Sequence, residues 1–361
     1  MGTGEWYTAS RGLVQLDMIR PGTLVLAAVL AAAPMQELPP VPPGPPIAPV
    51  APLPMPFNEW LDGVRAEAAQ RGIRPEVLER ALSDVEPVEQ VIERDRTQPE
   101  FTLDLESYLK RRLTKQTLRT AQQMYTKHRA LLGRIGDQYG VSPRILVSVW
   151  GIESNFGRFA GVRPTISTLA TLAYDPRRSA FFRGELFSAL EILNRGDVEL
   201  DRFKGSWAGA LGQPQFMPSS YLKYAQDFDG DGRRDIWSSQ PDVFASVAYY
   251  LQQHGWTRGQ AWGREIRIPA KLRAEAAAIP RREVGCRAER LMSDPRPLTA
   301  WRKLGFRAFN GGALPSSALE ASLVQAGNRS FLLYPNYTAI LDYNCAHTYA
   351  LSVALLADRV Q

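Results

Sequence analysis

A run of prolines divides this chain more sharply than any other feature of its sequence. Eleven of residues 34–56 are proline. Proline fixes one backbone torsion and lacks an amide donor, so this stretch favours extended polyproline II over a helix or the interior of a sheet. The sequence therefore predicts a semi-rigid linker over residues 34–56 and a folded part that begins at Phe57.

An apolar run precedes this linker. Residues 24–33 read LVLAAVLAAA, and Arg20 lies just before them. The run is far shorter than the roughly 20 residues of a membrane span. A basic residue, a short apolar segment and small residues at its end are typical of a secretory signal peptide. We expect residues 1–33 to be such a signal, starting at Met1 or at Met18, and the mature chain to carry no transmembrane segment.

The pattern after Phe57 is helical. Apolar residues recur every three or four positions, and 45% of the 361 residues are hydrophobic, enough for a sizeable core. The clearest helices are expected at 144–153, 179–194, 218–226, 241–254 and 346–360. Shorter, turn-broken segments fill residues 263–335, including expected strands at 264–268 and 331–334. The fold class is mainly α, with a helical region at 57–262, a small β-containing subdomain at 263–335 and a C-terminal segment at 336–361 that returns to the core.

One carboxylate stands at the end of an apolar helix. Residues 147–157 read VSVWGIESNFG, so Glu153 is flanked by Trp150, Ile152 and Phe156. Such surroundings disfavour the charged form of a carboxyl and raise its pKa, which suits a general acid near neutral pH. A surface glutamate at a helix C-terminus fits the same pattern.

Longer motifs decide between these two interpretations. Residues 151–157 (GIESNFG), 205–220 (GSWAGALGQPQFMPSS) and 170–178 (ATLAYDPRR), with Tyr-Pro-Asn at 334–336 and Tyr-Asn at 343–344, resemble the lytic murein transglycosylase B family. The similarity runs from about Phe57 to the C-terminus. It implies a lysozyme-like α-helical core with the catalytic glutamate at the end of an apolar helix, where Glu153 stands.

The resemblance also implies the chemistry. This family cleaves the β-1,4 bond between N-acetylmuramic acid and N-acetylglucosamine of peptidoglycan without water, and forms a 1,6-anhydro product. Glu153 would be the single acid and base. The implied substrate-binding residues are Tyr108, Ser154, Ser206, Gln215, Tyr250, Tyr343, Asn344 and Tyr349. The expected partners are peptidoglycan glycan strands and cell-wall enzyme complexes, and the protein is expected to be a periplasmic monomer.

An acidic loop fits a calcium site. Residues 227–235 read DFDGDGRRD, which matches D-x-D-x-D-G, although Ser238 replaces the usual glutamate at position twelve. The family resembled has an EF-hand-like loop here, at 227–242. The implied ligands of a structural Ca²⁺ are Asp227, Asp229, Asp231, the Arg233 carbonyl and Asp242. An acidic turn that binds nothing is the alternative.

The chain has only two cysteines, Cys286 and Cys345, too few for a disulfide scaffold or a cysteine-rich zinc site. An exported chain enters an oxidising compartment, where a pair of thiols persists as a bridge. We expect one disulfide between them. Two unpaired buried cysteines are the alternative.

Charge and composition limit the other functions. The net charge of +6 fits an acidic polymer, an anionic membrane or nucleic acid, but no Lys/Arg run is dense enough to indicate a nucleic-acid binder. Only three histidines are present, which argues against a multi-histidine metal site. A non-catalytic peptidoglycan-binding protein, a hydrolytic muramidase using Asp175 or Glu185, and a calcium-dependent adhesion protein are the remaining alternatives.

Overall fold

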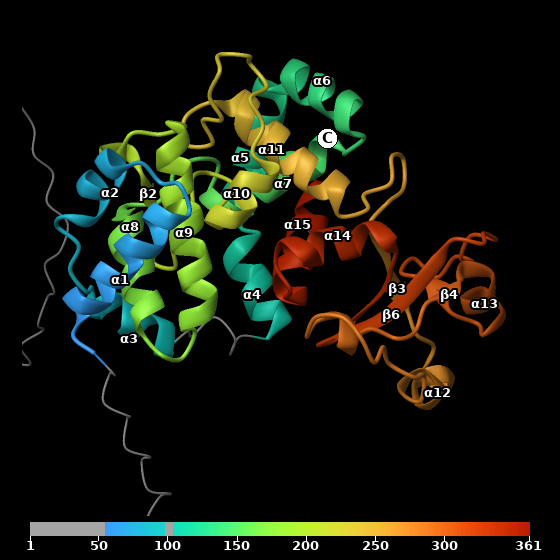
Figure 1. The fold of residues 1–361 in the computed structure, drawn as a ribbon. Helices are drawn as coiled ribbons and strands as arrows, with labels where there is room; N and C mark the ends of the chain where they lie inside the picture. The colour runs from blue at the N-terminus through green and yellow to red at the C-terminus, as the bar shows by residue number, and fades with distance from the viewer. Residues whose placement is uncertain (1–54, 98–103) are drawn as a thin grey trace, which may run out of the picture. The chain divides into compact units, whose positions relative to one another are not determined.

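The computed structural model describes residues 55–97 and 104–361, all within one compact unit (Figure 1). The predicted signal peptide at 1–33 and nearly all of the predicted linker at 34–56 lie outside the described residues. The chain is mainly α-helical with small antiparallel sheets, so the predicted fold class is confirmed.

The first helices form a layer with two later ones. They are α1 (Phe57–Gln70), α2 (Pro75–Leu82) and α3 (Glu89–Thr97), and they pack on α8 (Thr165–Tyr174) and α9 (Ser179–Arg195). Helix α2 shows why these residues fold in this way. Proline occupies its first turn, and Leu78, Ala81 and Leu82, spaced along one face, are its buried residues.

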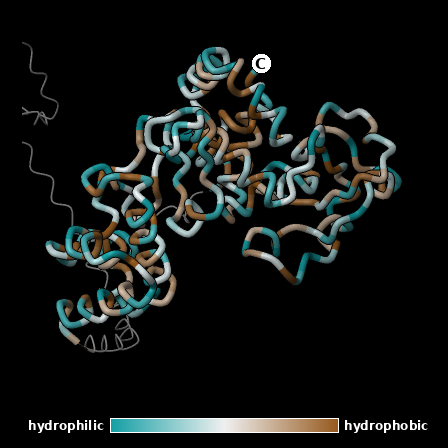
Figure 2. The backbone as a smooth tube through the Cα atoms, turned by 45° about the horizontal axis from the view of Figure 1, so that its top comes forward, coloured by the Kyte–Doolittle hydropathy of each residue, from teal (hydrophilic) through white to brown (hydrophobic). Residues whose placement is uncertain are grey.

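A second group of helices surrounds α7 (Pro143–Ser154), whose residues 145–152 are all buried. A helix that is apolar on every side belongs in the interior. Figure 2 shows the hydrophobic stretches gathered inside the helical body. The neighbours of α7 are α5 (Lys115–Lys127), α6 (Arg129–Tyr139), α11 (Gln240–Gln253) and α15 (His347–Ala357). The remaining helices of this body are α4 (Leu105–Arg112), α10 (Pro218–Tyr224) and α14 (Pro335–Tyr343).

Residues 263–333 supply a five-stranded antiparallel sheet in the order β4-β6-β7-β3-β5. Its strands are β3 (Gly263–Arg267), β4 (Arg296–Pro297), β5 (Arg307–Ala308), β6 (Glu320–Ala326) and β7 (Arg329–Leu333). Alternation along β7 divides the two faces: Leu332 joins a separate apolar cluster with Trp301 and Phe306, whereas Phe331 joins the main core. Two short helices, α12 (Arg273–Ala277) and α13 (Leu298–Lys303), accompany this sheet, and a smaller sheet pairs β1 (Arg163–Pro164) with β2 (Lys204–Gly205).

A disulfide joins the sheet region to the helical body. Cys286 and Cys345 form the bridge, with Cα atoms 6.2 Å apart and a sequence separation of 59 residues. In the chain-entropy account, closing a loop of this length stabilises the fold by about 4 kcal/mol. The bridge therefore fixes the segment between α14 and α15 against the loop that precedes β4.

Within residues 55–97 and 104–361, no helix combines the length and the apolar character that crossing a membrane requires.

Candidate active site

Glu153 lies in the last turn of the buried helix α7, just before the chain leaves the core. Asn155 and Phe156, directly after the helix, both have left-handed torsions (φ 49° and 59°), so the chain turns sharply. The turn brings the Phe156 ring back over Gly151, where an added Cβ would lie 2.6 Å from ring atoms. Gly151 and the turn together fix the end of α7, and with it the position of Glu153.

The pKa of Glu153 is strongly raised. The residue as a whole keeps some exposed surface, but its carboxyl group lies among buried neighbours. Loss of solvation raises the pKa from 4.5 to about 7, and the Tyr349 hydroxyl and the Arg112 guanidinium partly oppose this rise. Arg112 is held in place by a 3.1 Å hydrogen bond to the Ile152 carbonyl. The Tyr349 hydroxyl is buried beside the carboxyl without a well-aligned hydrogen bond. Near pH 7, Glu153 is therefore both a proton donor and a proton acceptor.

Ser154, predicted to bind substrate, has a different role in this structure. It is completely buried, and its hydroxyl donates to the Trp150 carbonyl (3.0 Å) and accepts from the Gly157 amide (3.1 Å). A buried hydroxyl with both partners present cannot reach a sugar. Ser154 instead holds the turn after Glu153, and the prediction for this residue is wrong.

The predicted tyrosines come together around Glu153. Tyr343 and Tyr349 stack with ring centroids 6.3 Å apart, and Tyr250 approaches Tyr343 at 4.7 Å. The charge of Glu153 contributes to the raised pKa of both Tyr343 and Tyr349, although burial is the larger cause. Tyr108, on α4, lies near enough to Tyr349 to affect its pKa as well. Residues from α4, α11, α14 and α15 thus form one aromatic wall beside a single carboxyl.

Hydrogen bonds fix part of this wall. The Tyr250 hydroxyl donates to the Asp342 carbonyl (2.7 Å) and the Tyr343 hydroxyl donates to the Pro214 carbonyl (2.8 Å). Tyr250 is buried, so it supports the wall from behind, whereas Tyr108 and Tyr343 are partly exposed. Asn344 is exposed at the end of α14: its backbone amide donates to the Ile340 carbonyl (3.3 Å), whereas its side-chain amide makes no hydrogen bond within the part of the chain that the structure describes.

The loop at 205–216 forms another side of the site. The Ser206 hydroxyl accepts from the Ala208 and Ala210 amides (3.3 and 3.1 Å), which closes a tight turn. The side-chain amide of Gln215, at φ 56°, donates to the Gly212 carbonyl (2.7 Å). Both side chains thus shape the loop, and both are partly exposed.

Gln213 was missed by the sequence analysis. Its buried amide accepts from the Trp150 indole (2.6 Å) and donates to the Trp237 carbonyl (2.7 Å). Gln213 therefore links Trp150, one turn before Glu153 on α7, to Trp237 in the acidic loop. Arg112 was also missed, because its contact with Ile152 joins positions 40 residues apart. Only the occurrence of Gln213 within the 205–220 motif hinted at its importance.

Three carboxylates of the acidic loop converge. Oxygen atoms of Asp227, Asp229 and Asp242 lie within 4.8 Å of one another. Burial, helped by the nearby charge of Asp229, raises the pKa of Asp242 to about 6, although hydrogen bonds from the backbone amides of Phe228, Asp235 and Asp229 oppose the shift. Carboxylate oxygens held this close repel one another, and a hard cation that they coordinate removes this repulsion. Asp231, predicted as a ligand, is not in this group; it accepts from the Arg233 amide (2.8 Å).

The fold and this site define a class: lysozyme-like helical proteins with one desolvated glutamate at the end of a buried helix. The chain belongs to the Transglycosylase SLT domain family, whose sequence profile matches residues 56–358, and the predicted resemblance is confirmed. It is 31% identical over 260 residues to the membrane-bound lytic murein transglycosylase B of Escherichia coli (strain K12), a match that covers 70% of this chain. The chain spans 66% of that relative's length.

Solved structures agree with this assignment. SltB3 from Pseudomonas aeruginosa, in complex with NAG-anhNAM-pentapeptide, superposes with a TM-score of 0.77 at 41% identity, over 84% of this chain and 78% of that one. The Escherichia coli lytic transglycosylase Slt35, in complex with calcium, superposes with a TM-score of 0.69 at 27% identity, over 84% of this chain and 92% of that one.

Proposed function

We propose that this protein is a lytic transglycosylase that cleaves the β-1,4 bond between N-acetylmuramic acid and N-acetylglucosamine in peptidoglycan and leaves a 1,6-anhydro end. The observation that carries the proposal is that Glu153, at the end of a buried helix and beside a wall of tyrosines, has a pKa raised to about 7. A relative bound to NAG-anhNAM-pentapeptide and another named as a murein transglycosylase support the substrate.

One carboxyl suffices for this reaction. Protonated Glu153 gives its proton to the glycosidic oxygen as the bond to the anomeric carbon breaks. The carboxylate then takes the proton of the muramic 6-hydroxyl, whose oxygen attacks that carbon and closes the anhydro ring. Glu153 ends protonated, as it began. The N-acetyl group of the substrate can stabilise the anomeric carbon in place of a second carboxylate.

A hydrolytic muramidase would normally need a second carboxylate. Glu185 is buried, and its oxygens accept from the Ser219 amide (2.9 Å) and the Ser219 hydroxyl (2.7 Å) at the start of α10. Asp175 is paired with Arg96 (3.2 Å). Among residues 55–97 and 104–361, no other carboxylate contributes to the pKa of Glu153. These observations favour the non-hydrolytic reaction.

We further propose that Asp227, Asp229 and Asp242 hold a structural Ca²⁺, with Asp231 and the Arg233 carbonyl able to join. The bound ion would cancel the repulsion between the carboxylates and stiffen the loop. The backbone amide of Gln213, in the site loop, donates to the Ile236 carbonyl (2.9 Å) within the acidic loop 227–242, so calcium would support the site indirectly. The relative solved with calcium supports this assignment.

The cellular setting follows from the proposed substrate. We infer a periplasmic monomer, exported by the signal at 1–33, that acts on glycan strands and joins cell-wall enzyme complexes. Nucleic acid is not expected as a partner. The predicted division at residues 57–262, 263–335 and 336–361 is retained as part of this proposal.

Mass spectrometry of digested sacculi tests the reaction. The purified chain should release muropeptides with 1,6-anhydro ends. Glu153→Gln should bind sacculi but release none, because an amide has no proton to give at neutral pH. Glu199→Gln, at an exposed position, is the matched control and should retain activity. Reducing muramic ends would indicate a hydrolase, and sacculus binding without product from the wild-type chain would indicate a binding protein.

A further inference from the structure

The positive charge of the chain is concentrated in one part. Residues 263–335 contain 13 basic and 6 acidic side chains, a net charge of +7, whereas the whole chain carries +6. Two ion pairs join side chains within this part: Arg329–Glu265 (2.7 Å) and Arg282–Glu289 (3.5 Å). Because its basic side chains outnumber its acidic ones about two to one, the region carries a positive field.

Two of these arginines line a hollow of about 490 Å³ at one end of the five-stranded sheet. Arg267 and Arg273 are both exposed, and Phe309, which is 57% exposed, forms part of the same wall. Arg267 also lies directly opposite Arg307 across the β3–β5 pair. Like charges in this position destabilise a sheet. Within residues 55–97 and 104–361, none of these three arginines forms an ion pair.

The lining of the hollow indicates the ligand. Arginine forks bind carboxylates with two parallel hydrogen bonds, and an exposed aromatic ring suits the flat face of a sugar. Gln325, Asn328 and Ser330 add uncharged donors and acceptors. A membrane surface would instead be met by several apolar side chains, and Phe309 is the one large exposed hydrophobic residue in this lining.

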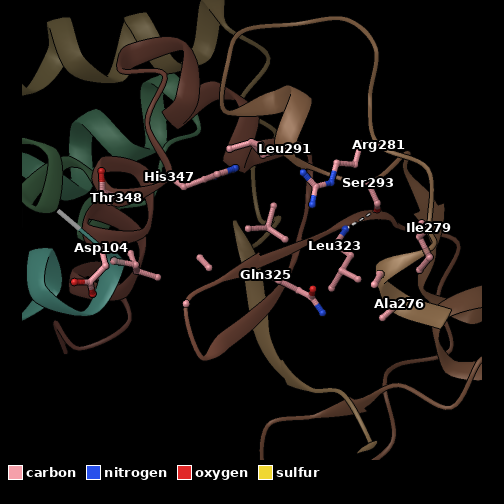
Figure 3. Close-up of a pocket in the computed structure, with 15 residues that line it drawn as sticks. Asp104, Ala276, Ile279, Arg281, Leu291, Ser293, Leu323, Gln325, His347 and Thr348 are labelled. Atoms are coloured by element: carbon pink, nitrogen blue, oxygen red, sulfur yellow. Dashed lines mark hydrogen bonds between the residues drawn. The ribbon is translucent and has the colours of Figure 1, made fainter. Parts of the chain in front are cut away.

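The hollow shares part of its lining with a second cavity. Gln325 and Gly327, at the β6–β7 turn, also line this second cavity, of about 380 Å³. Its opposite wall comes from Asp104 and His347–Thr348, with Arg281 turned inward from the sheet region (Figure 3). Thr348 directly precedes Tyr349, beside Glu153. The second cavity is therefore bordered both by the β6–β7 turn, which it shares with the hollow, and by the first turn of α15, the helix that carries Tyr349.

We propose that the hollow formed by Arg267, Arg273 and Phe309 binds the peptide-stem carboxylates of the peptidoglycan strand being cleaved. The inference rests on the proposed function, since it assigns a second contact for the same polymer. The basic region draws the anionic stems toward the sheet while the glycan is held at Glu153.

A binding assay in the Glu153→Gln background separates this role from turnover. The probes are sacculi with intact stems, glycan strands whose stems have been removed, and phosphatidylglycerol vesicles. Arg267→Gln with Arg273→Gln is the test variant. Arg302→Gln with Lys303→Gln removes the same charge from exposed positions of α13 outside the hollow and is the control. Both pairs are on the surface, so folding should be unaffected, which melting curves will verify.

The test variant should bind intact sacculi about 5- to 10-fold more weakly, with a shallower salt dependence, and stem-free strands as before. The control should change sacculus binding less than twofold. Unchanged sacculus binding, or an equal loss on stem-free strands, would overturn the proposal. A loss seen only on vesicles would assign the face to anionic lipid instead. Anhydro ends released from sacculi by the wild-type chain are scored separately, so failure of the proposed reaction can be told apart from failure of this site.

Discussion

Replacing Glu153 by glutamine should stabilise the protein at alkaline pH and not at acidic pH. The pKa of Glu153 is about 7 in the folded chain, against 4.5 for an unperturbed glutamate. Between these two values the folded state binds a proton that the unfolded state has lost, so stability falls as pH rises through this window. The difference of 2.5 pKa units corresponds to a destabilisation of the folded state by about 3 kcal/mol. This destabilisation is fully present above pH 7 and absent below pH 4.5.

Glutamine removes this cost because it stays neutral at every pH. Urea unfolding at pH 4.5 and pH 8.5 should therefore show the Glu153→Gln variant close to the wild type at the lower pH and about 2–3 kcal/mol more stable at the higher one. Asp242, with its pKa near 6, titrates in both proteins, and its effect cancels in the difference. Glu199→Gln should show no such pH-dependent gain. A stability difference for Glu153→Gln that is the same at both pH values would refute the desolvation argument.

Three further predictions concern the frame of the site. Gln213→Leu leaves the Trp150 indole and the Trp237 carbonyl without partners, and should lower the free energy of unfolding by about 2–4 kcal/mol in urea titrations, whereas Gln253→Leu on the surface should change it little. Calcium in the millimolar range should raise the melting temperature and a chelator should lower it; a chain carrying Asp227→Asn and Asp229→Asn should not respond to either. Reducing the Cys286–Cys345 bridge should cost about 4 kcal/mol of stability, and unchanged unfolding under reductant would contradict the loop-closure account.

Local patterns in the sequence located the main elements. Helix α7 was expected at 144–153 and occurs at Pro143–Ser154, because an unbroken apolar run follows a proline at its first turn and ends near Asn155. Strand β7 was expected at 331–334 and occurs at Arg329–Leu333. In both cases the signal is contained within a dozen neighbouring residues, so distant contacts were not needed to find it.

The contacts that hold the site could not be found in this way. Gln213 meets Trp150 across 63 residues, and nothing in either neighbourhood specifies that meeting. The family resemblance assigned Ser154 to substrate, yet one step along the helix from Glu153 turns a side chain by about 100° and carries it into the core. Asp231 illustrates the same limit, since the loop pattern does not reveal that its carboxylate accepts from the Arg233 amide while those of Asp227, Asp229 and Asp242 converge.

The last helix has a consequence for when the protein can act. Helix α15 packs against α7, and it carries Tyr349 to the side of Glu153, almost 200 positions later in the sequence. Synthesis proceeds from the N-terminus, so residues 143–154 are complete long before residues 347–357 exist. Until residues 347–357 have been made, α7 has one uncovered apolar side and Glu153 lacks its Tyr349 neighbour. With more water around the carboxyl, its pKa would move back toward that of an ordinary glutamate, so we expect full reactivity only after α15 has docked.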